Sequence, residues 1–166
     1  WRRGLQDLPL IGNRSMLRLL DLPVLMVLRV PGLIAPRYVG LIGMDGSRVV
    51  ISIDGSVATV EADLLERYWS GQAHVFWRDF DELGPVLAVG ARGPGVLRLQ
   101  QLLQRAGALQ TEPSGVFDKP TETAILEFQR AHQLAPDGRV GPFTRIALYA
   151  AAGRYQRPTL QAQGPS

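Results

Sequence analysis

The sequence predicts two successive folding units, an α+β unit with an antiparallel sheet followed by an all-α unit of three helices. β-branched residues and Asp-Gly turns characterise the first half of the chain, whereas apolar residues spaced three and four apart characterise the part after Gly95. A stretch rich in glycine and proline separates the two patterns. We therefore expect an N-terminal unit at 1–83, a linker at 84–95, a helical unit at 96–153 and a flexible tail at 154–166.

Strands of the first unit are expected where apolar residues run between turn signals. Four such runs follow one another along the chain: 24–30, 38–44, 48–53 and 57–60. Asp-Gly pairs separate the last three runs, and glycine in such a pair accepts the positive φ of a hairpin turn. A further strand is expected at 73–77, and short helices are expected at 15–20, with Asn13 as the N-cap, and at 61–68.

Three helices are expected in the second unit. The first has an apolar face at 96–106 and ends at Gly107. The second has Asp118 as its N-cap and Pro120 in its first turn, and the third begins at Pro142. These signals favour a small helical bundle.

A short motif occurs twice in this half of the chain. The segment Gly-Val-Phe-Asp-Lys-Pro-Thr at 115–121 recurs as Gly-Arg-Val-Gly-Pro-Phe-Thr at 138–144. In both copies the glycine permits a tight turn, an apolar residue (Phe117 or Val140) plugs the core, and the threonine can bond backbone N–H groups in the first turn of a helix. The repeat indicates two loops of the same construction.

Composition narrows the function classes. The chain has no cysteine, which excludes disulfides, thiolate metal sites and a cysteine nucleophile within it. It has two histidines, His74 and His132, no zinc-protease motif and no serine in a nucleophile elbow. We therefore expect no catalytic residue, no metal and no cofactor.

Positive charge is concentrated in the second half, where residues 87–157 contain nine basic and five acidic side chains. These cations are spread out rather than clustered in runs, so we expect no nucleic-acid partner. The longest uncharged stretch, 68–77, is too short to span a bilayer. Membrane attachment is therefore expected only through a segment upstream of Trp1.

Residues of the second half follow a fixed order and spacing: Val96, Leu99-Gln100, Leu103, Gly115-Val116-Phe117, Thr121, Ala124-Ile125, Phe128-Gln129, Leu134, Asp137-Gly138, Val140-Gly141-Pro142 and Thr144. This pattern closely resembles the peptidoglycan-binding type 1 domain. Asp118-Lys119 stands where Gly-Pro is usual in the first copy, but aspartate is itself a good N-cap. The resemblance implies a three-helix module that binds murein, the peptidoglycan of the cell wall.

Murein binding would need polar side chains that recognise glycan or stem peptide. The candidates are Arg98, Gln100, Gln101, Gln129, Arg130, Asp137, Arg139 and Arg145. Arginines could pair with stem-peptide carboxylates in a forked geometry, and the amides could contact glycan hydroxyls or peptide carbonyls. Three alternatives stay open: the glutamines could bond inside the bundle, the arginines could lie on a solvated face, and Asp137 could belong to a turn.

The first unit resembles a second family. Arg37-Tyr38-Val39-Gly40-Leu41, followed by Asp54, resembles the His-Tyr-Val-Val-Leu and Asp region of bacteriocin-processing, C39-like peptidases of the papain fold. The resemblance implies a half-papain unit in which Arg37 replaces the catalytic histidine and Asp54 keeps the position of the orienting carboxylate. Arginine stays charged near neutral pH and cannot act as a general base there. Whether the family's cysteine-bearing helix precedes Trp1 or has been lost stays open.

The order of these two units, with the sequence Val-Phe-Trp-Arg-Asp at 75–79 between them, resembles the periplasmic region of the general secretion pathway protein A family. That resemblance implies a periplasmic fragment of an inner-membrane-anchored protein that binds peptidoglycan, pairs with a protein B and helps the secretin of type II secretion to assemble. Dimerisation of the parent protein would raise avidity without new contacts. Two alternatives remain: a murein hydrolase or cysteine-peptidase-like enzyme targeted by the same module, and a protein–protein adaptor in the secretion apparatus.

Overall fold

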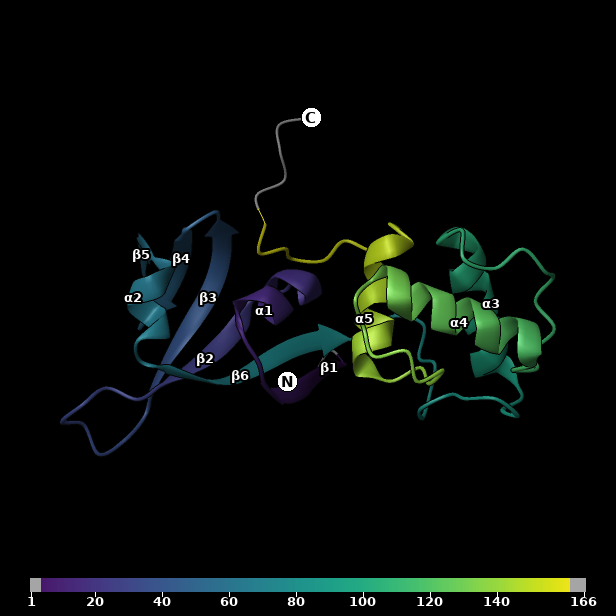
Figure 1. Ribbon diagram of the computed structural model, residues 1–166, viewed down its shortest axis with the longest axis horizontal. Coiled ribbons are helices and arrows are strands. Elements are labelled where there is room, and N and C mark those ends of the chain that lie inside the picture. The colour runs from purple at the N-terminus through teal and green to yellow at the C-terminus, as the bar shows by residue number, and fades with distance from the viewer. Residues whose placement is uncertain (1–3, 162–166) are drawn as a thin grey trace. The chain divides into compact units, whose positions relative to one another are not determined.

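The computed structural model describes residues 4–161, which form two compact units (Figure 1). Unit 1 combines residues 4–77 with residues 157–161, and unit 2 consists of residues 78–156. The stretch expected to be a linker, 84–95, therefore lies inside unit 2. The chain returns to unit 1 after unit 2 is complete.

Unit 1 is an α+β unit with an antiparallel sheet, as predicted. Its six strands follow the order β1-β6-β2-β3-β4-β5. β2 pairs antiparallel with β3 and β6, and β4 pairs antiparallel with β3 and β5. The strands are β1 (Leu5–Ile11), β2 (Val24–Leu28), β3 (Arg37–Asp45), β4 (Arg48–Ile53), β5 (Ser56–Glu61) and β6 (Trp69–Arg78).

The structure adds β1 to the predicted strands and begins β6 at Trp69 rather than at Ala73. β1 has Pro9 in its interior, and a proline within a short apolar run usually indicates that the run is not a strand. Proline is tolerated here because β1 lies at one edge of the sheet, where one side of the backbone has no strand to bond.

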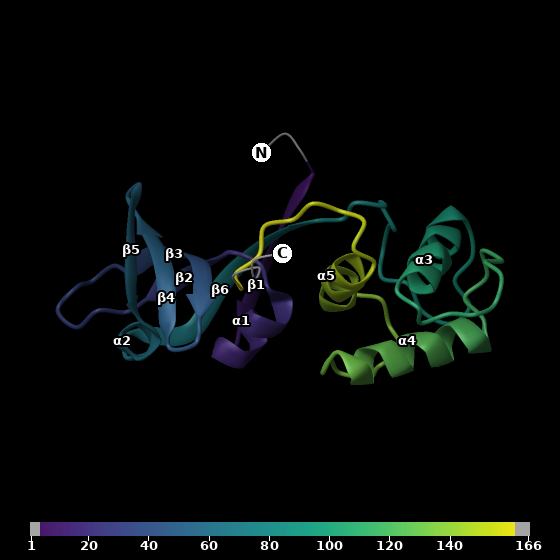
Figure 2. The same ribbon diagram turned by 90° about the horizontal axis from the view of Figure 1, so that it is seen from above.

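Two short helices, α1 (Arg14–Leu20) and α2 (Ala62–Glu66), cover one face of this sheet (Figure 2). Leu17 of α1 and Leu65 of α2 line the same small apolar cavity as Met26 of β2. The core of unit 1 therefore lies between these helices and the side of the sheet to which Met26 points.

Residues 157–161 complete unit 1, where the sequence predicts a flexible tail. The side chain of Leu160 is only 1% exposed. Its carbonyl accepts a hydrogen bond from the N–H of Met44 at 2.6 Å. Met44 belongs to β3 but lies beyond Leu41, the last residue of β3 that pairs with β2. A single buried leucine carries no periodic signal, so the sequence did not reveal this segment. Residues 162–166 of the predicted tail lie outside the described part of the chain.

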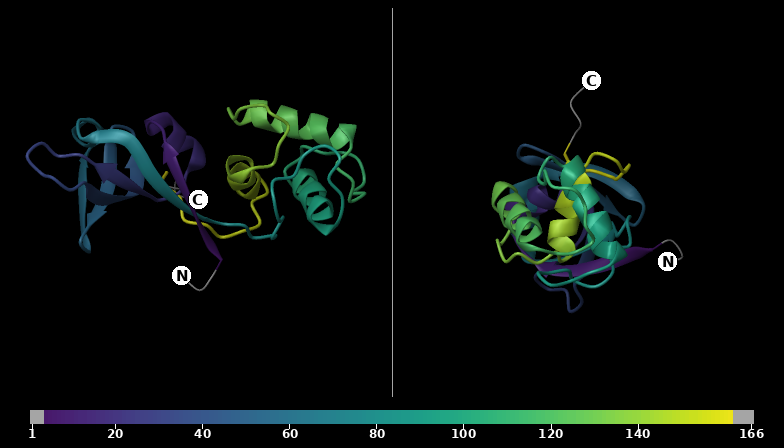
Figure 3. Two further views of the ribbon diagram at one scale, coloured as in Figure 1. Left: turned by 90° about the horizontal axis from the view of Figure 1, so that it is seen from below. Right: turned by 90° about the vertical axis from the view of Figure 1, so that its right-hand side faces the viewer.

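Unit 2 contains three α-helices, α3 (Pro94–Arg105), α4 (Lys119–Ala131) and α5 (Pro142–Ala151). α3 packs against α5, and α4 lies on one side of both (Figure 3). Their apolar faces and the two repeated loops supply buried side chains to one core: Val96, Leu99, Leu103, Phe117, Ile125, Phe128, Val140, Ile146 and Leu148.

The stretch expected to be a linker pairs with both repeated loops of unit 2. The N–H of Val140 donates to the carbonyl of Leu87 at 2.8 Å, and the N–H of Phe117 donates to the carbonyl of Ala91 at 2.9 Å. Leu87 is itself buried. The glycines and prolines of this stretch therefore form turns within the unit rather than a connection between units. None of the helices within residues 4–161 is long and apolar enough to cross a lipid bilayer.

Candidate functional site

Gln100 of α3 closes the first repeated loop from inside unit 2. Its Oε1 accepts hydrogen bonds from the backbone N–H groups of Ser114 and Gly115, both at 2.8 Å. Its Nε2 donates to the carbonyl of Val116 at 2.9 Å and to Oγ1 of Thr121 at 3.0 Å. The side-chain amide is thus saturated by the loop that it holds.

Gln129 of α4 closes the second repeated loop in the same way. Its Oε1 accepts from the N–H of Gly138 at 3.0 Å. Its Nε2 donates to the carbonyl of Arg139 at 2.9 Å, to Oγ1 of Thr144 at 3.1 Å and to Oδ1 of Asp137 at 2.9 Å. The repeat seen in the sequence is therefore a repeat of hydrogen bonds, with one helical glutamine for each loop.

Both glutamines are structural rather than exposed to a ligand. Gln100 and Gln129 are each 1% exposed, and contact with glycan or peptide would break the bonds that close their loops. The structure therefore favours the alternative that these two amides bond inside the bundle. We remove both from the set of candidate murein contacts.

Asp137 also belongs to the second loop. Its Oδ1 accepts from the N–H of Arg139 at 2.9 Å, which is an Asx turn, and from the amide of Gln129. The hydrogen bond from the N–H of Arg139, followed by that from Gln129, holds the pKa of Asp137 below its ordinary value of 3.8. In the first loop, the hydrogen bond from the hydroxyl of Thr121 lowers the pKa of Asp118. The carboxylate of Asp137 thus stabilises a turn.

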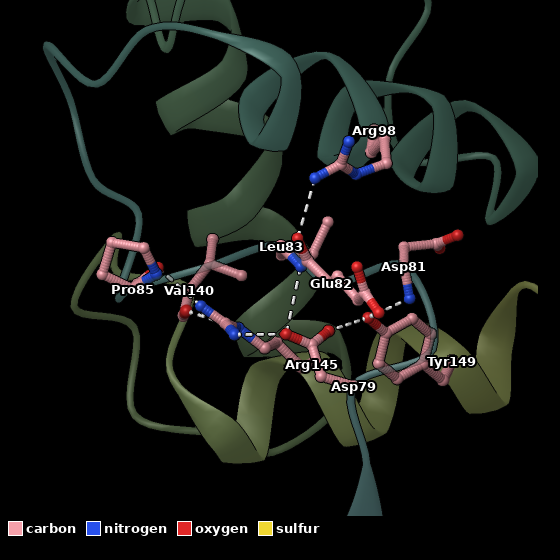
Figure 4. Close-up of polar contacts among 9 residues, drawn as sticks. All are labelled: Asp79, Asp81, Glu82, Leu83, Pro85, Arg98, Val140, Arg145 and Tyr149. Atoms are coloured by element: carbon pink, nitrogen blue, oxygen red, sulfur yellow. Dashed lines mark hydrogen bonds and ion pairs between the residues drawn. The ribbon is translucent and has the colours of Figure 1, made fainter. Parts of the chain in front are cut away.

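Arg145 is a buried structural cation and not a surface contact (Figure 4). It is 5% exposed, and its Nη1 lies 2.9 Å from Oδ2 of Asp79. Its Nη2 donates to the carbonyl of Pro85 at 2.7 Å, and its Nε donates to the carbonyl of Val140 at 3.2 Å. The prediction that Arg145 contacts a ligand is corrected accordingly, because its donors are engaged inside unit 2.

Asp79 is the centre of this network, and no local pattern in the sequence identifies it, because it precedes the stretch predicted to be a linker and its partner Arg145 is 66 positions away. Besides Arg145, it accepts hydrogen bonds from the hydroxyl of Tyr149 and from the N–H of Leu83 (Figure 4). Burial, followed by the bond to Asp79, raises the pKa of Tyr149 well above its ordinary value. Nη2 of Arg98 donates to the carbonyl of Glu82 at 2.8 Å. Asp79 and Arg98 together fasten the segment before α3 to the helices.

Three predicted contact residues remain available to a ligand. The side chains of Gln101, Arg130 and Arg139 are exposed and have no hydrogen bond or ion pair within residues 4–161. Arg130 follows Gln129, whose amide binds the carbonyl of Arg139. The structure therefore brings the two arginines to the second loop, which we call the second-loop corner (Arg130 and Arg139).

The first loop has an equivalent corner with different chemistry. Gln101 follows Gln100, whose amide binds the carbonyl of Val116 at 2.9 Å. Gln101 and Val116 thus occupy the positions that Arg130 and Arg139 occupy in the second copy. One copy of the repeat is neutral at this corner, whereas the other carries two cations beside the carboxylate of Asp137. The remaining positive charge suits an anionic ligand at the second copy.

The two positions that resemble a peptidase active site lie in unit 1, and His132 ends α4 as its C-cap. Arg37 begins β3 and Asp54, with φ of 49°, lies in the turn after β4, and both are exposed. His132 stacks on Phe128, and its Nδ1 lies 2.9 Å from the carbonyl of that residue. Within residues 4–161 no three histidine, aspartate or glutamate side chains form a group that could hold a metal ion.

Known proteins that resemble this chain include a peptidoglycan-binding family and two bacterial secretion proteins. Residues 92–148 match the family described as "Putative peptidoglycan binding domain". The chain is 28% identical over 144 residues to "Putative general secretion pathway protein A" of Escherichia coli (strain K12). The aligned region covers 86% of this chain and 29% of that protein. It also resembles the crystal structure of a periplasmic domain of the EpsAB fusion protein of the Vibrio vulnificus type II secretion system, with a TM-score of 0.58 and 26% identity over 87% of this chain and 63% of that one. The chain thus spans under a third of the length of the E. coli relative.

Proposed function

We propose that this chain is a non-catalytic, periplasmic, peptidoglycan-binding part of a type II secretion assembly protein, which anchors that protein to the cell wall and helps the secretin to assemble. The match of residues 92–148 to a peptidoglycan-binding family carries the proposal. The names of the E. coli and V. vulnificus relatives support the secretion context.

The second-loop corner is the part of unit 2 that we propose contacts murein. Guanidinium groups bind carboxylates through two parallel hydrogen bonds, and stem peptides carry carboxylates. Arg130 and Arg139 are exposed and make no hydrogen bond or ion pair through their side chains in the described part of the chain, whereas Gln100, Gln129 and Arg145 are engaged internally. Exposed contacts of this kind are individually weak and screened by salt, so binding gains strength from several copies along one polymer.

We extend the proposal to unit 1, which we infer to be a degenerate C39-like domain of half-papain type. The pairing of Gly40 with Ser52 brings Arg37 and Asp54 to the same end of the β3–β4 pair. Arginine cannot serve as a general base, and the chain contains no cysteine, so we propose no peptidase activity. The parent protein is proposed to be anchored in the inner membrane, to work with a protein B partner and to dimerise.

Co-sedimentation with intact murein sacculi tests the wall-binding role. The full chain is compared with the double variant Arg130→Glu/Arg139→Glu and with Arg92→Glu/Arg105→Glu, which makes the same change in net charge elsewhere on unit 2. We expect the first variant to bind roughly tenfold more weakly, the control to bind like the parent chain, and all binding to weaken as salt rises.

Two results would contradict the proposal. If the chain stays in the supernatant at every salt concentration, unit 2 is better explained as a protein–protein adaptor. If the purified chain releases soluble muropeptides from the sacculi, the non-catalytic assignment is wrong.

A further inference from the structure

A groove of about 500 Å³ lies in unit 1, and none of its lining residues belongs to the set discussed for murein binding. It forms where the pairing of β2 with β6 changes register: Met26 faces Ala73, but Leu28 faces Trp69. Such a bulge separates two strands locally and bends the bulged one. Tyr38 of β3, which pairs with Val27, and Gln72 of β6 line the opening.

The groove lies on the side of the sheet opposite α1 and α2. Met26 faces the cavity beneath those helices, and successive side chains of a strand point to opposite faces, so Val27 and its cross-strand partner Tyr38 face away from them. Tyr38 is 56% exposed, which is high for a tyrosine in the middle of a sheet. This face of unit 1 is thus open at the groove.

Three polar side chains of the groove have unused hydrogen-bonding capacity. The guanidinium of Arg29, the side-chain amide of Gln72 and the hydroxyl of Tyr38 have no partner within residues 4–161. His74, by contrast, is held in place, because its Nδ1 lies 3.1 Å from both carboxylate oxygens of Asp7. The groove therefore combines a fixed wall with free donors and acceptors.

The size and the walls of the groove restrict its ligand. Binding sites for small molecules occupy roughly 300–1,000 Å³, a range that includes this groove. Pro9 and Pro36 supply rigid apolar surface, while Arg29 supplies a positive charge. Such a combination suits a short peptide with apolar side chains, amide groups and a free carboxylate.

We infer that this groove binds the stem peptide of murein through a carboxylate. Arg29 pairs with the carboxylate, Gln72 bonds a peptide amide, and Tyr38 covers an apolar side chain of the ligand. The choice of stem peptide rests on the proposed wall binding of unit 2. Two weak contacts from one chain to one polymer would raise the avidity above that of either contact alone.

Nuclear magnetic resonance of the full chain tests this inference directly. The probe is the synthetic tetrapeptide L-Ala–γ-D-Glu–meso-diaminopimelate–D-Ala, added to ¹⁵N-labelled protein. We expect the side-chain signals of Arg29 and Gln72 to shift on addition. Arg29→Gln should weaken binding about tenfold, whereas Arg67→Gln, which changes an exposed arginine of unit 1 outside the groove, should leave binding unchanged.

Three results would overturn the inference. The first is an absence of shifts at Arg29 and Gln72 with the folded protein, and the second is equal binding by the Arg29→Gln and Arg67→Gln variants. The third is equal affinity for an all-L acidic tetrapeptide, which would show that the groove does not select stem peptide. If the full chain still pellets with sacculi in any of these cases, the proposed function stands and the groove inference alone fails.

Discussion

The carboxylate of Asp21 accepts a hydrogen bond from the backbone N–H of Leu160 at 2.9 Å, across a sequence separation of 139 residues. The same oxygen accepts the N–H of Gln161, and the other oxygen accepts Nη2 of Arg157 at 3.2 Å. Asp21 ends α1 in the left-handed region, with φ of 48°, a conformation in which glycine is usual. Aspartate is less favourable than glycine in this backbone conformation, but its carboxylate holds the C-terminal segment in place. Unit 2 is therefore inserted within unit 1 rather than appended to it.

Truncating Leu160 should destabilise unit 1. Leu160→Ala removes a fully buried side chain, and we expect the free energy of unfolding to fall by about 2–4 kcal/mol. Leu64→Ala makes the same chemical change at an exposed position of α2 and should cost far less. Urea unfolding followed by tryptophan fluorescence measures both. Equal losses in the two variants would show that residues 157–161 do not belong to the fold.

Replacing Arg145 should affect stability and not ligand contact. Arg145→Met leaves the carboxylate of Asp79 buried without its ion pair, which costs about 3–5 kcal/mol. The double variant Asp79→Leu/Arg145→Met removes both charges and should recover part of that loss. Thermal unfolding gives the stabilities, and sacculus binding is measured below the lower Tm. Weakened binding by a fully stable Arg145→Met variant would restore Arg145 as a murein contact.

The two neighbouring residues Gln129 and Arg130 should respond differently to mutation. Gln129→Leu leaves the N–H of the buried Gly138 without its partner and removes one of the two donors to the carbonyl of Arg139, which should cost about 1–3 kcal/mol of stability. Arg130→Leu changes an exposed side chain and should alter stability little while weakening sacculus binding. Chemical denaturation and co-sedimentation of both variants separate the two roles. A stable Gln129→Leu variant would contradict the loop-closing role of the amide.

Acid should weaken the second loop through Asp137. The pKa of this carboxyl is lowered in the folded chain, so its contribution to stability is present above the ordinary value of 3.8 and is lost as the pH falls through the lower folded pKa. Titration of the Asp137 side-chain carbon by NMR should place the midpoint below 3.8. Asp137→Asn should reduce the acid dependence of unfolding of unit 2. A midpoint at or above the ordinary value would show that the Asx turn does not form in solution.

Local signals in the sequence predicted most elements correctly. Asn13 caps α1 through its Oδ1, and Asp118 caps α4 in the same way, because a capping bond spans only three residues. The Asp-Gly turns at 45–46 and 54–55 lie between paired strands for the equally local reason that glycine accepts positive φ. Among the predicted contact residues, Arg130 and Arg139 are exposed, whereas Gln100, Gln129 and Arg145 are buried, and murein contact by the two exposed arginines stays a prediction.

By itself the sequence determined the helices, the hairpins, the repeated loop and the resemblance to a peptidoglycan-binding module. Each of these depends on residues that are close in the chain. Only the tertiary structure decided that Arg145 is buried against Asp79, that Leu160 returns to unit 1 and that a bulge opens a groove beside Tyr38. Burial and ion pairing depend on partners that are far apart in the chain, such as Asp79 and Arg145 with their sequence separation of 66. The residue type alone therefore cannot distinguish a solvated arginine from a buried one.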